Sequence, residues 1–151
     1  MSAICFIGID PGSSSGGVAF IDGDYITGMK LEGATERDVC DFLQTAIDRG
    51  EVFAFIERVG ARPGQGVSSM FKFGQSYGML RGLLVGMKIP FDQVTPQKWQ
   101  KAMGCMTKGD KNVSKAKAQQ LFPGERITHA VADALLIAEF CRRLRTGALV
   151  A

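Results

Sequence analysis

Residues 7 to 20 read IGIDPGSSSGGVAF, an apolar run that ends on an aspartate and resumes as a second apolar run after a cluster of glycines and serines. The first run extends back to Ala3, and nearly unbroken apolar sequence is typical of a strand covered on both faces. We therefore expect residues 3–10 to form a strand at the centre of a sheet. The carboxylate of Asp10 at its end needs a chemical explanation, because an unpartnered charge beside a core is costly.

The next residues predict an antiparallel hairpin followed by a crossover. Segments 16–22 and 25–31 are apolar and joined by turn residues, so they should neighbour the first strand. Thr35 is a suitable N-cap for a helix over 36–50. The apolar strand that follows, EVFAFIERV, also places an acid, Glu57, near its end. A strand, a crossover helix and another strand imply parallel pairing, so the sheet should be mixed.

The rest of the chain completes an α/β domain. We expect, in order, a loop over 60–69, a helix over 68–88, a core strand over 89–96, a short helix or turn over 97–104, a basic loop over 107–114, a short helix over 115–122 and a long helix over 128–147. No repeat or linker interrupts the sequence, so residues 1–151 should form a single domain.

Glycines recur every four residues in the helix expected over 68–88. Gly78, Gly82 and Gly86 therefore share one face. Each costs a helix up to about 1 kcal/mol relative to alanine. We expect a close approach at this face to offset that cost, either to the sheet or to a second subunit.

Length and composition exclude several classes of protein. No apolar run is long enough to span a membrane, and the first residues lack the basic start of a secretory signal. A cytoplasmic protein without a membrane partner is expected. The four cysteines form no Cys-x-x-Cys pair and are expected to be reduced and mostly buried.

Charge is segregated along the chain, although the net charge is only +3. Residues 1–57 carry ten acidic and three basic side chains, whereas residues 58–117 carry eleven basic and two acidic ones. Basic side chains gathered on one face would bind a phosphate backbone, and the alternative is a solvated surface with scattered lysines. The candidate DNA-binding residues are Arg58, Arg62, Lys72, Lys98, Lys101, Lys108, Lys111 and Lys115.

Acids that end or interrupt apolar segments predict a metal site. Asp10 and Glu57 end parallel strands and should meet at one edge of the sheet. In the last helix Asp133 lies within AVADALLIAEF, and His129 projects from the same side one turn earlier. Carboxylates brought together repel one another unless a cation lies between them, and Mg²⁺ prefers oxygen ligands. We therefore expect Asp10, Glu57, Asp133 and His129 to form a Mg²⁺ site.

Each of these residues also has a purely structural explanation. Asp10 could begin the turn that follows it. Glu57 could form a surface ion pair with a nearby arginine, and His129 could pair with Asp133 at the helix end. Their joint occurrence favours a shared site.

Five segments of the chain resemble the RuvC-type Holliday junction resolvases of the ribonuclease H-like superfamily, in particular variants carried by bacteriophages. These segments are IGIDPGSSSGGVAF, FIERVGARPGQG, FGQSYGMLRGLL, VTPQKWQK and HAVADALLIAEF, and the resemblance covers about residues 4–145. It implies a ribonuclease H-like fold, in which a mixed five-stranded sheet is flanked by helices.

The resemblance also implies an activity, which is symmetric nicking of four-way DNA junctions by a Mg²⁺-dependent homodimer. It further implies that Mn²⁺ can substitute for Mg²⁺, that the products carry 5′ phosphates and that no nucleotide cofactor is required. Asp10, Glu57 and Asp133 match the metal-binding carboxylates of the family. Lys111 matches a basic residue near the scissile phosphate, and Lys98 or Lys101 could have a comparable role.

The chain departs from the family pattern at two places. Cellular members carry an acid or a histidine three residues before the last aspartate, where this chain has Ala130, so His129 is the nearest substitute as a ligand or as a residue that orients water. Bacterial members also contact unpaired junction bases with an aromatic residue just after the acid that Glu57 matches. Phe71 and Phe73 are the candidates here, with core packing expected for at least one of them.

Two other functions fit parts of the sequence. The DPGSSSGG segment resembles the phosphate-binding hairpin of actin-like kinases, but those proteins need two such domains, for which 151 residues leave no room. A module that binds branched DNA and cleaves it weakly or not at all remains an alternative, because Ala130 stands at a ligand position.

Overall fold

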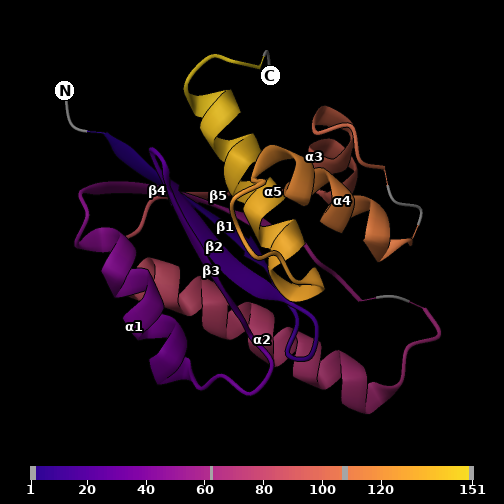
Figure 1. The fold of residues 1–151 in the computed structure, drawn as a ribbon. Helices are drawn as coiled ribbons and strands as arrows, with labels where there is room; N and C mark the ends of the chain where they lie inside the picture. Colours follow the sequence, from indigo (N-terminus) through magenta and orange to yellow (C-terminus); the bar gives the residue numbers. More distant parts are fainter. Residues whose placement is uncertain (1–2, 62, 107–108, 150–151) are drawn as a thin grey trace.

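The computed structural model describes residues 3–61, 63–106 and 109–149 as a sheet with helices on both faces (Figure 1). The elements are β1 (Ile4–Asp10), β2 (Gly17–Asp22), β3 (Tyr25–Lys30), α1 (Glu36–Ile47), β4 (Glu51–Glu57), α2 (Val67–Gly86), β5 (Phe91–Val94), α3 (Pro96–Ala102), α4 (Lys111–Leu121) and α5 (His129–Arg145). In Figure 1, α1 and α2 cover one face of the sheet, and α5 covers the other with α3 and α4 beside it.

The sheet has five strands in the order β3-β2-β1-β4-β5. Strand β1 is central, antiparallel to β2 and parallel to β4, which confirms the predicted hairpin, crossover and mixed sheet. Ile9 pairs with Ile56, so Asp10 and Glu57 follow at the same edge. Side chains alternate between the two faces of a strand. Asp10 therefore lies on the same face as Phe6, the face that α5 covers.

Helix α5 packs directly on the backbone of the sheet because two strand residues are glycines. A Cβ atom at Gly8 would collide with the Ala134 carbonyl oxygen, and one at Gly17 would collide with the Ala130 carbonyl oxygen. These contacts bring α5 across β1 and β2 near the end of β1. Asp133, which directly precedes Ala134, is thereby placed over the strand end that carries Asp10.

Helix α2 does not direct its glycines at the sheet, so the first of the two expected explanations for them is wrong. Its buried residues are Ser76, Leu80 and Leu84. Gly78 and Gly82 have no heavy atom within contact distance of a Cβ position, so their face points to solvent. No helix of the described ranges is long and apolar enough to cross a membrane.

Two further elements differ from the sequence prediction. The segment expected as a basic loop over 107–114 becomes helical from Lys111 onward, because the Asp110 side chain accepts a hydrogen bond from the backbone N–H of Asn112 and caps the helix. Strand β5 is an edge strand whose middle residues, Asp92 and Gln93, are exposed, so it is not the core strand that was expected. Segment 97–104, expected as a helix or turn, is mostly the helix α3.

The four cysteines are free thiols, as expected. Cys5, Cys105 and Cys141 are buried and Cys40 is half-buried. Burial raises the pKa of Cys105 to about 11, with a smaller contribution from Asp133. Burial also raises the pKa values of Cys5 and Cys141, so these three buried thiols are protonated at neutral pH and act as small apolar side chains.

Candidate active site

A cleft of about 1050 Å³ opens at the carboxyl ends of β1 and β4. Its lining includes Asp10 and Glu57 from the two strand ends, Asp133 from α5 and Lys111 from the first turn of α4. The loop after β1 and the residues after β4 form further parts of its wall. Four of the five residues expected to carry the chemistry thus face one cavity.

The carboxylates in this cleft affect one another electrostatically. Burial raises the pKa of Asp10 well above its ordinary value, and the negative charges of Glu57 and Asp133 raise it further, while Lys111 opposes the shift. Burial likewise raises the pKa of Asp133, against the opposing effects of Ser114, Lys111 and His129. The Ser114 hydroxyl makes no hydrogen bond of standard geometry to any described residue. The Ser114 hydroxyl therefore lowers the pKa of Asp133 through its short distance from the carboxylate and not through a well-formed hydrogen bond.

The donor chemistry of the cleft fits a hard divalent cation. Asp10, Glu57 and Asp133 offer carboxylate oxygens, which Mg²⁺ and Mn²⁺ bind, and a cation would relieve the repulsion that raises the pKa of Asp10. Across the described ranges, however, no three His, Cys, Asp or Glu side chains are already drawn together as a metal site. Metal binding would have to draw these carboxylates closer.

The raised pKa of Asp10 predicts the pH dependence of stability without metal. The folded protein binds the Asp10 proton more tightly than the unfolded chain does, so protonated Asp10 contributes to the free energy of unfolding. This contribution is complete below the ordinary pKa of 3.8 and is lost as pH rises through the raised pKa of the folded state. Between these two pKa values, the free energy of unfolding of the wild type falls by at most about 1.4 kcal/mol per pH unit because of Asp10. In urea unfolding with EDTA, the Asp10→Asn variant should therefore become more stable relative to the wild type as pH rises. Mg²⁺ should reduce this difference in the free energy of unfolding, because it would stabilise the ionised carboxylates of the wild type. Parallel pH profiles would contradict this.

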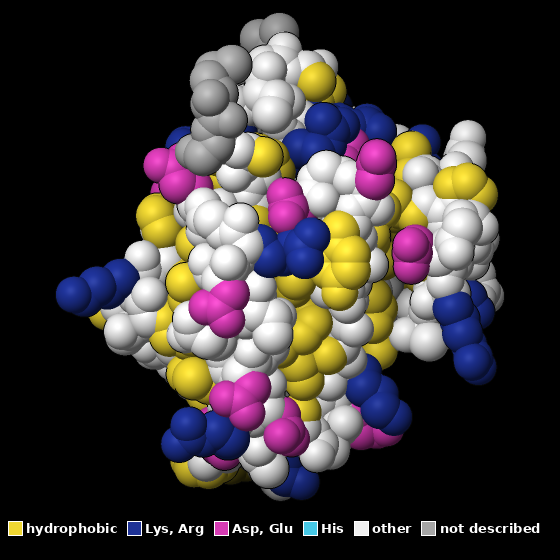
Figure 2. Space-filling model, turned by 60° about the vertical axis from the view of Figure 1, so that its left-hand side comes forward, with side chains coloured by type: hydrophobic (Ala, Val, Ile, Leu, Met, Phe, Trp, Pro, Cys, Tyr) yellow, Lys and Arg dark blue, Asp and Glu magenta, His cyan; other side chains and the backbone are white. Residues whose placement is uncertain are grey.

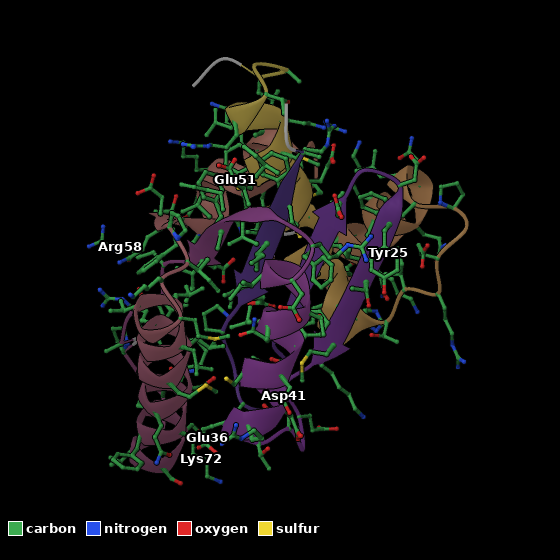
Figure 3. All side chains as sticks on the ribbon, turned by 90° about the vertical axis from the view of Figure 1, so that its left-hand side faces the viewer. Tyr25, Glu36, Asp41, Glu51, Arg58 and Lys72 are labelled. Carbon is green, nitrogen blue, oxygen red and sulfur yellow. The ribbon has the colours of Figure 1, made fainter. Side chains whose placement is uncertain are left out.

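Some of the basic residues predicted to bind DNA lie at the cleft. Arg58 and Lys72 line it together with Lys111, and Figure 3 shows Arg58 and Lys72 extending outward. Lys98, Lys101 and Lys115 lie outside its lining, and Arg62 and Lys108 are outside the described residues. On the face drawn in Figure 2, basic and acidic side chains are interspersed. Three of the predicted basic residues thus line the cleft beside its acidic residues, and the role of the whole set in DNA binding stays a prediction.

His129 is not among the residues that line the cleft. Its imidazole is exposed, and Nε2 lies 2.9 Å from Oδ1 of Asn112 in the first turn of α4. Its charge nevertheless helps to lower the pKa of Asp133. His129 is thus close to the carboxylates, but its ring is held by Asn112.

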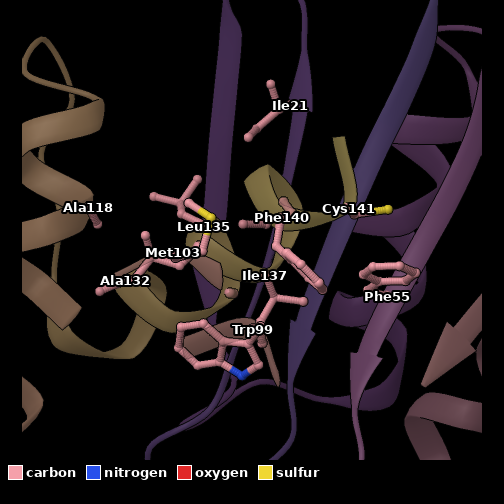
Figure 4. Close-up of a cluster of buried hydrophobic side chains, with 14 of the residues drawn as sticks. Ile21, Phe55, Trp99, Met103, Ala118, Ala132, Leu135, Ile137, Phe140 and Cys141 are labelled. Carbon is pink, nitrogen blue, oxygen red and sulfur yellow. The ribbon is translucent and has the colours of Figure 1, made fainter. Parts of the chain in front are cut away.

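Glu57 is held by a residue to which the sequence prediction gave no role. The indole Nε1 of Trp99 donates a hydrogen bond to Glu57 Oε2 at 2.7 Å. Trp99 lies in α3 and its side chain is fully buried among apolar residues (Figure 4). A buried indole N–H needs an acceptor. The sequence therefore contained a signal, a lone tryptophan in a chain rich in candidate acceptors, but not the identity of its partner.

Comparisons with known proteins agree with this architecture. No family model and no curated protein sequence matches the chain. Among solved structures, Thermus thermophilus RuvC in complex with a Holliday junction substrate aligns with a TM-score of 0.61 at 15% identity, covering 95% of this chain and 96% of that one. A second T. thermophilus RuvC structure aligns at 0.58 and 18% identity, with the same coverage. The chain has the RuvC fold.

A eukaryotic protein shares this RuvC fold. Ydc2, the yeast mitochondrial Holliday junction resolvase, aligns with a TM-score of 0.54 at 15% identity, covering 96% of this chain and 79% of that one. Three structures of junction resolvases therefore superpose on nearly the whole chain. At these identities, the shared property is the ribonuclease H-like arrangement of sheet and helices, as the sequence resemblance implied.

Within the RuvC fold, the two candidate aromatic residues differ from expectation. Phe73 is half-buried and lines the cleft, whereas Phe71 is 69% exposed. Neither belongs to the apolar core clusters of the described residues, so the expected core packing is wrong. Phe73 therefore presents an aromatic ring in the same cavity as Asp10.

A second cleft of about 640 Å³ adjoins the first, since Arg58 and Val59 line both. It adds Arg81 and Tyr77 from α2, and the Arg81 guanidinium lies 5.7 Å from the centre of the Tyr77 ring. Arg81 was not among the residues predicted to bind DNA. It adds a second arginine beside Arg58 in this cleft, whose lining also includes Asp92 from β5.

Proposed function

We propose that this protein is a metal-dependent endonuclease that nicks branched DNA, with the four-way junction as its principal substrate. The observation that carries the proposal is the gathering of Asp10, Glu57, Asp133 and Lys111 in one cleft of a RuvC fold. Support for the substrate comes from the similar RuvC structure, which holds a Holliday junction substrate.

Asp10, Glu57 and Asp133 would hold Mg²⁺, or Mn²⁺ in its place. When bound, these ions supply Lewis-acid stabilisation of the phosphodiester and a water molecule of lowered pKa. Asp10, which interacts with both other carboxylates, would be the shared ligand. Lys111 would bind a phosphate oxygen of the strand to be cut, because its ammonium group is at the cleft and exposed.

The DNA backbone would follow the basic residues outward from the cleft. Arg58 and Lys72 flank the carboxylates, and Arg81 continues the path in the adjoining cleft. Such contacts provide affinity without base sequence specificity. Phe73, which lines the cleft, would stack on a base unpaired at the branch point. Lys98, Lys101 and Lys115 would contact the DNA arms further out.

A junction has two-fold symmetry, so a homodimer is the natural arrangement for paired nicks. The solvent-facing side of α2 supports this proposal, because it exposes large apolar side chains beside its glycines. Val67 is 89% exposed and Val85 is 67% exposed. An apolar stripe interrupted by glycines allows two helices to approach closely.

Leucine in place of Gly82 should weaken the dimer. One overpacked side chain typically costs about 1–3 kcal/mol, which corresponds to about 5- to 150-fold weaker dimerisation. Light scattering over a dilution series would measure the mass. The matched control is Ala116→Leu on the exposed side of α4, which should leave the mass unchanged. An undiminished dimer in Gly82→Leu would contradict this interface.

The proposed activity is tested with a labelled synthetic four-way junction and a linear duplex of the same length, each incubated with Mg²⁺ or Mn²⁺. We expect nicks at symmetric positions near the branch point, 5′ phosphates on the products and little cutting of the duplex. Three-way and flap substrates in the same series establish the order of preference. A protein that cuts the duplex as fast as the junction would contradict structure selectivity.

A second candidate is a branched-DNA-binding module with weak or no cleavage. The observation in its favour is that no three candidate ligands are drawn together as a metal site in the described part of the chain. Ala130, at the family's ligand position, also contributes its carbonyl to the contact with Gly17 and no side-chain donor. Junction binding without nicking in either metal would support the module.

A further inference from the structure

We infer that Trp99 is a positioning residue for Glu57 and that its indole N–H reports directly on the state of the carboxylate cleft. The inference rests on the proposed function, because it assigns Glu57 to that site. Its structural basis is the 2.7 Å hydrogen bond from Trp99 Nε1 to Glu57 Oε2.

The topology of the sheet brings these two residues together. Glu57, the last residue of β4, pairs with Val94, the last residue of β5. The backbone N–H of Arg58 also donates to the Val94 carbonyl at 2.7 Å. Helix α3 begins at once, with Thr95 as N-cap and Pro96 in its first turn, so Trp99 lies one turn beyond the strand ends. The position of the indole is thus set by strand pairing and not by a flexible loop.

The indole ring itself is fixed by packing. Trp99 is 0% exposed and belongs to the core cluster that includes Met103 and Ile137. Figure 4 shows the ring nitrogen on the side that faces away from the labelled apolar side chains. A ring held in this way has one orientation for its N–H. It therefore restrains the side-chain torsions of Glu57.

The choice of acceptor points to a functional role. A hydrogen bond between a neutral indole and a carboxylate is charge-assisted, and it leaves one oxygen of Glu57 in a defined place beside the cleft. Partners of this kind orient ligands, and their loss typically costs about 10- to 100-fold in metal affinity or activity. A purely structural tryptophan would affect stability and leave the metal dependence unchanged.

The single tryptophan makes the hydrogen bond directly observable. In ¹⁵N-labelled metal-free protein, the indole N–H gives one cross-peak, and Glu57→Gln should move it while the rest of the spectrum stays dispersed. Addition of Mg²⁺ should shift the peak in the wild type, and Mn²⁺ should broaden it by its paramagnetism. Both responses should be much weaker in Asp10→Asn.

The positioning role is measured by Trp99→Phe, which keeps an aromatic ring and removes the donor. The Mg²⁺ concentration for half-maximal nicking should rise about 10- to 100-fold, with junction binding in EDTA unchanged. The matched control is Phe140→Leu, which alters a ring buried in the same core cluster without removing a donor. It should lower stability and leave the Mg²⁺ dependence as in the wild type.

The outcomes separate this inference from the proposed function. An indole peak that Glu57→Gln leaves in place would overturn the hydrogen bond, whatever the activity. A peak that moves, together with a Trp99→Phe variant of unchanged Mg²⁺ dependence, would reduce Trp99 to a structural residue and overturn the positioning role. If the wild type neither nicks junctions nor responds to Mg²⁺, the proposed function fails, and the assignment of a positioning role fails with it even if the hydrogen bond is seen.

Discussion

Replacing Asp10 by asparagine should abolish junction nicking while junction binding persists. Asp10 interacts electrostatically with Glu57, Asp133 and Lys111, so its carboxylate is at the centre of the cleft's charge. Asparagine keeps the shape of the side chain and removes the charge that would hold a cation. Metal-assisted charge stabilisation is worth several kcal/mol, so the rate should fall by at least about 10³-fold.

Nicking would be followed with a labelled four-way junction at saturating Mg²⁺, and binding by gel shift in EDTA. Asp41→Asn is the matched control, because Asp41 is an exposed acid on α1, on the far side of the sheet from α5. It should nick at the wild-type rate. If Asp10→Asn retains more than a few per cent of the wild-type rate, Asp10 is not a shared ligand.

Valine in place of Gly8 should destabilise the protein strongly. A side chain at this position collides with backbone atoms of α5 at Ala134 and Ala138, which cannot move without shifting the helix. Overpacking typically costs about 1–3 kcal/mol, and a collision with helix backbone belongs at the upper end, about 3 kcal/mol. Because the same contact places Asp133, nicking should fall further than the loss of folded protein explains.

Urea unfolding at constant m-value measures the loss of stability. The matched control is Gly124→Val, since Gly124 has open space around its Cβ position and lies in the connection between α4 and α5. Its unfolding free energy should change little. Equal stabilities for the two valine variants would show that α5 does not rest on the backbone of β1.

Much of the fold follows from local sequence patterns. The unbroken apolar run of β1 predicts a central strand, and the short connections to β2 and β3 predict their order. The crossover between β1 and β4 then places Asp10 and Glu57 at one edge, before any side chain is positioned. These predictions succeed because they depend on chain connectivity and on the alternation of side chains along strands.

Other features depend on contacts between distant segments and were missed. The sequence shows glycines at 8 and 17 but does not tell that a helix more than a hundred residues later rests on them. The glycines of α2 have the clearer pattern, yet they face solvent in the single chain. Helix α4 begins at Lys111, earlier than the sequence predicts, because Asp110 caps it within the segment predicted as a basic loop.

In the candidate site, too, some features follow from local sequence and others depend on contacts between distant segments. The three carboxylates could be named from the elements that carry them, whereas Trp99 could not, because its acceptor is set by the pairing of Glu57 with Val94. His129 was named from helical spacing, but its partner Asn112 comes from another helix. Spacing within one element predicts which side chains share a face, and only the packing of elements determines what they meet.

The central claim is that Asp10, Glu57 and Asp133 together hold divalent cations. Crystals grown with Mn²⁺ test it most directly, through an anomalous difference map at the manganese absorption edge. We expect strong density in the cleft within bonding distance of oxygens from all three carboxylates, and none there in Asp10→Asn. Well-ordered wild-type crystals without manganese in the cleft, or with the three carboxylates turned away from one another, would contradict the account.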